Sequence, residues 1–225
     1  MRKIFFSAKS IVLTLCLCAT SALAWAGVNP KPFVVPELKE WHGAEGQMTV
    51  SGKYVVKGGK AAAEVGQMFA ADYGSLMGTQ LTLKNGKPSK GDIVLVLKAD
   101  KALGQEGYRI SIGDVTTVKG LKWGTRTVLQ MAEQNKSNGG TLPKGNIVDS
   151  PEYGLRGFMM DCGRKFIPMD YLRSLVKTMA YYKMNTLQIH LNDNGFRQFF
   201  DGDWDKTQAA FRLECDTYPG LTARD

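Results

Sequence analysis

The chain has 225 residues, with 29 basic residues, 21 acidic residues and a formal charge of +8. The basic excess is mild and its lysines are scattered through turns without any nucleic-acid fingerprint, so we expect no nucleic-acid partner. Because His42 and His190 are the only histidines and no Cys or His pair has ligand spacing, we also expect neither a metal site nor a cofactor.

The first 26 residues have the three parts of a secretory signal. Basic residues come first, an apolar run follows from Ile11 to Cys18, and small residues end the segment at Ala26. We expect cleavage after Ala26 and export to the periplasm or the extracellular space, with no transmembrane segment left in a mature chain of formal charge +5. A lipid anchor is disfavoured, because bulky leucines directly precede Cys16 and Cys18.

Removal of the signal leaves Cys162 and Cys215 as the cysteines of the mature chain. An oxidising compartment would allow the two to form a disulfide. The alternative is two unpaired thiols, and the sequence leaves both open.

Residues 34–134 alternate strand-like and helix-like segments after a short lead that contains prolines. The run from Ile93 to Leu97 is continuously apolar, which predicts a strand covered on both faces. Asn85-Gly86 and Gly113-Asp114 indicate turns. Residues 134–143 are polar and glycine-rich, so we interpret them as a link between domains. We expect strands within 46–57, 80–84, 93–97 and 107–112, and helices at 61–76 and 124–133.

The pattern changes after Ile147, where a strand, a helix and a second strand are predicted. The strands are expected at 157–161 and 186–191. Pro168 is expected to be the first residue of the helix, Asp170 to lie in its first turn, and Asn185 to end it. Apolar residues at helical spacing predict that one helix face packs on a sheet.

Two sets of residues form distinctive patterns. In the second half of the chain they are Arg156-Gly157, Asp161, Arg164, His190-Leu191-Asn192-Asp193 and Gly195-Phe196-Arg197, and in the first half Glu106-Gly107-Tyr108, Gly120, Gly124 and 127–130. The set in the second half resembles the opening of the catalytic barrel of family 20 glycoside hydrolases, the β-N-acetylhexosaminidases. The set in the first half is similar to the noncatalytic α+β domain that precedes this barrel.

The resemblance implies an α+β N-terminal domain followed by the start of a (β/α)8 TIM barrel that is incomplete, with about two strands. The expected domains are a signal peptide at 1–26, the noncatalytic α+β domain at 27–146 and a truncated first part of the catalytic domain at 147–225. Within the second part, Gln188 and His190 are expected to face the barrel interior.

The activity that the resemblance implies is retaining, substrate-assisted hydrolysis of terminal β-linked N-acetylglucosamine or N-acetylgalactosamine, so the expected partners are glycans that contain N-acetylhexosamine. The family's general acid and the Asp that orients the acetamido group lie on a later strand, and no residues of this chain match them. We therefore expect the chain alone to be inactive. The alternatives are a noncatalytic secreted protein that binds carbohydrate, and a secreted structural or partner-binding protein.

Five residues are candidates for the site. By resemblance, Arg156 is expected to bind sugar hydroxyls and Asp193 to support the general acid through a histidine from a later strand. His190 is a candidate for catalytic support or a barrel-core histidine. Asp161 and Arg164 are expected to be structural near the site, as an ion pair or a turn cap. The alternatives are a structural ion pair for Arg156 and a loop cap for Asp193, and the hypothesis requires Arg156 and Asp193 to converge on one mouth of the barrel.

Overall fold

The computed structural model describes residues 27–98, 101–163 and 167–191, which belong to two compact units that divide between Ser150 and Pro151. No helix in these described residues is long and apolar enough to cross a membrane. The first unit contains β1 (Glu40–Met48), β2 (Lys53–Lys57), α2 (Gly59–Met77), β3 (Thr82–Leu83), β4 (Ile93–Val96), β5 (Tyr108–Ile112), β6 (Thr116–Lys119), α3 (Leu121–Gln134) and β7 (Leu142–Asp149), with short 3-10 helices at Lys101–Leu103 and Lys136–Asn138.

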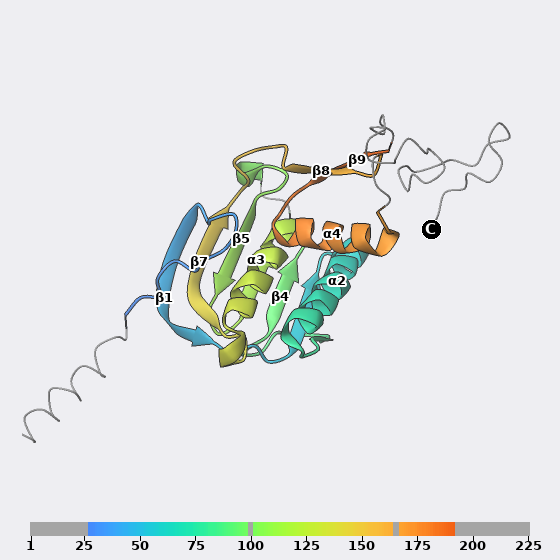
Figure 1. The fold of residues 1–225 in the computed structure, drawn as a ribbon. Coiled ribbons are helices and arrows are strands. Elements are labelled where there is room, and N and C mark those ends of the chain that lie inside the picture. Colours follow the sequence, from blue (N-terminus) through green and yellow to red (C-terminus); the bar gives the residue numbers. More distant parts are fainter. Residues whose placement is uncertain (1–26, 99–100, 164–166, 192–225) are drawn as a thin grey trace, which may run out of the picture. The chain divides into compact units, whose positions relative to one another are not determined.

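The strands of the first unit form one mixed seven-stranded sheet in the order β1-β7-β5-β6-β4-β2-β3. Along the sheet, neighbouring strands are antiparallel from β1 through β7 and β5 to β6. They are parallel from β6 through β4 and β2 to β3. Figure 1 shows α2 and α3 side by side on one face of this sheet. The predicted α+β domain is therefore present.

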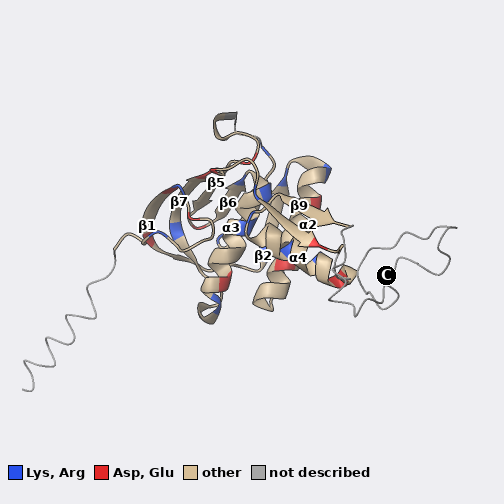
Figure 2. Ribbon diagram, turned by 45° about the horizontal axis from the view of Figure 1, so that its top comes forward, with Lys and Arg blue, Asp and Glu red and all other residues tan. Residues whose placement is uncertain are grey.

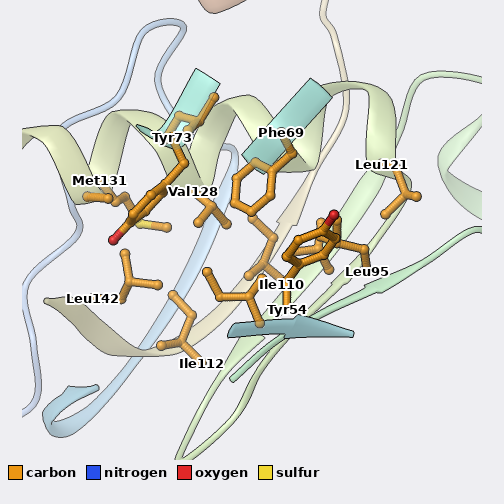
Figure 3. Packing of buried hydrophobic residues seen from close by; sticks show 14 of the residues in the cluster. Tyr54, Phe69, Tyr73, Leu95, Ile110, Ile112, Leu121, Val128, Met131 and Leu142 are labelled. Carbon is orange, nitrogen blue, oxygen red and sulfur yellow. The ribbon is translucent and has the colours of Figure 1, made fainter. Parts of the chain in front are cut away.

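A single hydrophobic core lies between the two helices and the sheet. Figure 3 shows Phe69 from α2 pointing toward Ile110 of the sheet, and Tyr73 from the same helix pointing toward Leu142. Because each Å² of buried apolar surface contributes roughly 25 cal/mol, this core is the main stabilising contribution to the first unit. The predicted burial of β4 on both faces is confirmed, because its first three residues are each no more than 3% exposed.

Gly120 and Gly124 allow α3 to lie close to β5 and β6, next to Gly107 and Tyr108. Gly120 has a φ of 82°, and a Cβ atom there would meet the backbone of Gly107 and Tyr108. A Cβ on Gly124 would stand 2.6 Å from Val118 and 3.4 Å from Tyr108. The Tyr108 hydroxyl lies 2.7 Å from the Thr127 hydroxyl and donates to the buried Asp149 carboxylate. These motif residues therefore build the packing of the first unit.

The lead before β1 is fixed by side-chain amides. Gln130 of α3 accepts from the backbone N–H of Val35 at 2.7 Å and donates to the Val35 carbonyl at 2.8 Å. Asn29 donates to the carbonyls of Ala44 and Gly46. Residues from Asn29 onward are thus part of the folded unit.

The linker predicted for this unit is wrong. Residues 134–143 do not link domains: they turn from α3 into β7, a strand paired on both sides, and the expected boundary between 146 and 147 falls inside that strand. The strands expected within 46–57 are the end of β1 and the whole of β2, and β1 begins earlier, at Glu40. The sequence LPKGNIVD of β7 does not alternate between apolar and polar residues, so the glycine-rich turn before it is the stronger local signal.

The second unit is a parallel βαβ unit, made of β8 (Gly157–Asp161), α4 (Met169–Tyr181) and β9 (Thr186–His190). The helix begins at Met169, one residue later than predicted, because Pro168 is the N-cap residue with an extended ψ of 147°, and Asp170 lies in the first turn as expected. The helix ends at Tyr181 rather than at Asn185, because Lys183 takes a left-handed φ of 60°. Met179 is the buried residue of the predicted apolar helix face.

Candidate functional site

The carboxyl ends of β8 and β9 bring two of the candidate residues together. The register pairs Gly157 with Thr186 at one end and Asp161 with His190 at the other. The N–H of Cys162 then donates to the His190 carbonyl at 2.9 Å and closes the ladder. Asp161 and His190 therefore stand side by side on the edge where parallel α/β folds place their ligands, an edge that we call the rim.

Asp161 also fixes the turn that follows β8. Its Oδ1 accepts a hydrogen bond from the backbone N–H of Gly163 at 3.0 Å, which is the kind of contact that a turn cap makes. The adjacent Cys162 is 5% exposed. Burial, and then the negative charge of Asp161, raise the pKa of the Cys162 thiol, which disfavours a reactive thiolate at this position.

Arg156 lies at the opposite end of the strand pair from the rim. It precedes the first residue of β8, and the five residues of that strand extend about 16 Å. Its Nε donates to the Lys183 carbonyl at 2.8 Å and its Nη1 to the Tyr153 carbonyl at 2.6 Å. The geometry therefore gives the guanidinium backbone partners and does not bring it to the rim, while a sugar-binding role for Arg156 stays a prediction.

The sequence predicts Asn185 only as the end of a helix. In the structure Asn185 also connects the entries of the two strands by hydrogen bonds. Its Oδ1 accepts from the backbone N–H of Arg156 at 3.0 Å, and its Nδ2 donates to the Gly154 carbonyl at 2.7 Å. Its own N–H donates to the Arg156 carbonyl at 2.9 Å. An asparagine between a helix and a strand is a common turn signal, but the partner 29 residues away leaves no local trace in the sequence.

Several predictions concern residues outside the described ranges. In the second part of the chain these are Arg164, Asp193 and Cys215, and at the front of the chain it is the expected signal at 1–26. Convergence of Arg156 and Asp193 on one mouth therefore stays a prediction, although Arg156 lies at the end of β8 remote from His190. The pairing of Cys162 with Cys215 likewise stays open.

Charged side chains are not concentrated on any one helix or strand of the described residues. Figure 2 shows Lys and Arg as well as Asp and Glu on both helices and strands. Within residues 27–98, 101–163 and 167–191, no three His, Cys, Asp or Glu side chains are grouped closely enough to hold a metal ion.

A hollow in the first unit is relevant to the alternative that the chain is a noncatalytic protein that binds carbohydrate. Its volume is about 330 Å³, and it lies between the start of α2 and the residues that follow β3. Its lining includes Val55, Lys57 and Leu83 and no aromatic residue. Sugar rings are commonly bound against aromatic faces, and this hollow offers none.

Two family models match the chain. The model described as "Glycosyl hydrolase family 20, domain 2" matches residues 31–150, and the model described as "Glycosyl hydrolase family 20, catalytic domain" matches residues 153–224. The chain therefore belongs to glycosyl hydrolase family 20. This confirms the resemblance found in the sequence and the predicted fold class, an α+β domain followed by the start of the family's catalytic domain.

The curated relatives agree with this assignment. A β-hexosaminidase of Akkermansia muciniphila is 42% identical over 76 residues, which cover 34% of this chain and 15% of the relative. A β-N-acetylhexosaminidase of Cellulomonas fimi is 27% identical over 174 residues, which cover 74% of this chain and 34% of the relative. The chain thus spans about a third or less of the length of these relatives.

The solved structures agree as well. The family 20 β-N-acetylhexosaminidase of Streptomyces coelicolor A3(2) is 25% identical with a TM-score of 0.68, covering 88% of this chain and 39% of that one. A β-hexosaminidase mutant of Streptomyces plicatus, solved with the product GlcNAc, is 27% identical with a TM-score of 0.64, covering 74% of this chain and 36% of that one.

Proposed function

We propose that this chain supplies the noncatalytic domain and the opening βα unit of an exported β-N-acetylhexosaminidase. The observation that carries the proposal is the match of residues 153–224 to the family's catalytic domain, in a unit whose register places Asp161 beside His190 at the rim. The proposed reaction is hydrolysis of terminal β-linked N-acetylglucosamine or N-acetylgalactosamine residues of glycans.

The proposed mechanism is retaining and substrate-assisted. The oxygen of the sugar's 2-acetamido group attacks the anomeric carbon, so no enzyme nucleophile is needed. A carboxylic acid protonates the leaving oxygen, and a carboxylate orients the acetamido group. No residues of this chain match that pair, so further barrel strands have to supply it. In this scheme Asp193 supports the acid through a histidine from a later strand, and His190 is a second candidate for catalytic support.

A requirement for the 2-acetamido group of the substrate distinguishes this mechanism from glycosidase mechanisms that use an enzyme nucleophile. We expect the 225-residue polypeptide to leave a chromogenic β-N-acetylglucosaminide intact, and a product of the same reading frame that carries the acid pair to cleave it. The matched control is the β-glucoside with a 2-hydroxyl, which lacks the attacking group and should not be cleaved. Comparable rates on the two substrates, or turnover by the 225-residue polypeptide, would contradict the proposal.

Export is part of the proposal and has its own test. The segment 1–26 is expected to be removed during secretion, so that the mature chain begins at Gly27. N-terminal sequencing of the exported protein checks this expectation. A chain that retains Met1, or that begins at Cys16 or Cys18 with a lipid, would contradict it.

A further inference from the structure

We propose that Asn85 is a site of spontaneous deamidation, where the folded chain exchanges a neutral amide for a carboxylate. Asn-Gly pairs occur at Asn85, Asn138 and Asn194. The structure describes the first two and gives them different hydrogen bonding, whereas Asn194 lies outside the described residues. The proposal does not depend on the proposed function, because the reaction needs only the chain and water.

The reaction starts with an attack by the backbone on the asparagine side chain. The backbone nitrogen that follows the asparagine bonds to the side-chain carbonyl carbon. The bond from that carbon to the amide nitrogen breaks, and the amide nitrogen leaves with the proton as ammonia. Water then opens the succinimide ring at one of its two carbonyl groups, which gives aspartate or isoaspartate. A following glycine favours the attack because it has no Cβ to obstruct the nitrogen.

The surroundings of Asn85 allow this attack. Asn85 is exposed and lies outside any helix or strand, two residues after the end of β3. Within the described residues, neither its side chain nor the N–H of Gly86 makes a hydrogen bond. Gly86 has a φ of 99°, and a Cβ atom there would meet nothing within 4 Å. The nitrogen of Gly86 can therefore turn toward the Asn85 side chain without breaking a contact.

The surroundings of Asn138 oppose the same attack, although Asn138 is exposed as well. It ends the short 3-10 helix that begins at Lys136. The N–H of Gly139 donates to the Lys136 carbonyl at 3.1 Å, and the N–H of Gly140 donates to the Asn135 carbonyl at 2.9 Å. A 3-10 helix has a ψ of about −20 to −30°, which directs the following nitrogen into the turn and not toward the side-chain carbonyl. Attack therefore requires this turn to open first.

The product at position 85 is expected to accumulate in folded protein. The N–H of Lys84 donates to the Tyr54 carbonyl at 2.8 Å, so the chain before the site stays attached to β2. The ammonium of Lys84 binds Ser89 and Asp92, each at 2.7 Å, and neither contact involves Asn85. A new carboxylate at this position thus displaces no partner and lies next to positive charge.

Ageing of the 225-residue chain in a mildly alkaline buffer tests the proposal. Trypsin, used at a mildly acidic pH so that digestion adds no conversion, releases the two sites in separate peptides, residues 85–90 and 137–144. Mass spectrometry detects the change from amide to carboxylate in each. We expect Asn85 to convert at least about tenfold faster than Asn138 in the folded chain, because the turn at Asn138 first has to lose hydrogen bonds. In the chain denatured with guanidinium chloride, the two sites should convert at similar rates.

A variant at the following glycine provides the matched control. Gly86→Ala adds a Cβ that obstructs the attacking nitrogen, so conversion of Asn85 should slow several-fold while conversion of Asn138 stays unchanged. If Gly86→Ala disturbs the fold, Asn85→Gln decides, because its extra methylene disfavours the five-membered ring and position 85 should then gain no carboxylate. Equal rates at the two sites of the folded chain, an Asn85 rate far below its rate in the denatured chain, or an undiminished rate in Gly86→Ala would overturn the proposal.

Discussion

Replacement of Tyr108 by alanine is expected to lower the free energy of unfolding of the first unit by about 4–5 kcal/mol. Tyr108 is 1% exposed and belongs to the core between α3 and the sheet. The substitution removes a large buried ring and also the hydroxyl that lies between Thr127 and Asp149. The cavity and the lost hydrogen bond to the buried Asp149 carboxylate act in the same direction.

A matched variant separates the two contributions of Tyr108. Tyr108→Phe keeps the ring and removes only the hydroxyl, so the expected loss is about 1–3 kcal/mol, the cost of losing a buried hydrogen bond to a charged group. Chemical denaturation followed by the fluorescence of Trp41 and Trp123, which both lie in this unit, measures both variants. A loss below about 1 kcal/mol for Tyr108→Ala would mean that the site relaxes around the missing ring, contrary to the packing described.

Acid is expected to weaken the same unit through Asp92. This carboxylate is 1% exposed and accepts hydrogen bonds of 2.7 Å from Ser51, Lys84 and the N–H of Ser89. Burial opposes its ionisation, but the hydrogen bonds and the charge of Lys84 outweigh burial and lower the pKa of Asp92 to about 2. The folded-state pKa is thus below the unfolded value of 3.8, so the stabilisation is present above about pH 4 and is lost as the pH falls toward 2.

The expected size of this contribution is about 2 kcal/mol at neutral pH. Denaturation curves measured from pH 7 down to pH 2 give its pH profile. In Asp92→Asn the part of the profile between pH 4 and pH 2 should flatten, and stability at pH 7 should fall, because the ammonium of Lys84 loses its charged partner. A variant with the same acid profile as the unaltered chain would show that other carboxylates carry the pH dependence.

The sequence was informative wherever one strong local pattern stood alone. The apolar run from Ile93, the strand from Gly157 and the start of the helix after Pro168 were each located to within about one residue, although that helix ends at Tyr181 and not at Asn185. β1 was harder because Gly43, Gly46 and its charged residues have low strand propensity. It forms a strand because β7 pairs with it across about 100 residues of sequence, a long-range contact that no local window contains.

The candidate site also depends on long-range contacts that no local stretch of sequence contains. Asp161 and His190 were placed on strands by alternation, and parallel pairing then brought them to one edge. Arg156 could be assigned to the entry of β8, but the direction of its side chain depended on the carbonyl of Lys183. That carbonyl is available because of a left-handed residue that the helical pattern did not indicate. The sequence therefore located these three residues, while three-dimensional context decided which of them meet.

The side-chain amide contacts of the lead have a consequence for proteolysis at its front end. Both backbone hydrogen-bonding groups of Val35 are occupied by the side chain of Gln130, and Gln134 donates to the carbonyl of Phe33. Asn29 comes before them and is already held by the carbonyls of Ala44 and Gly46. An aminopeptidase acting on a chain that begins at Gly27 should therefore stop ahead of Asn29, and the protein that remains should still be folded.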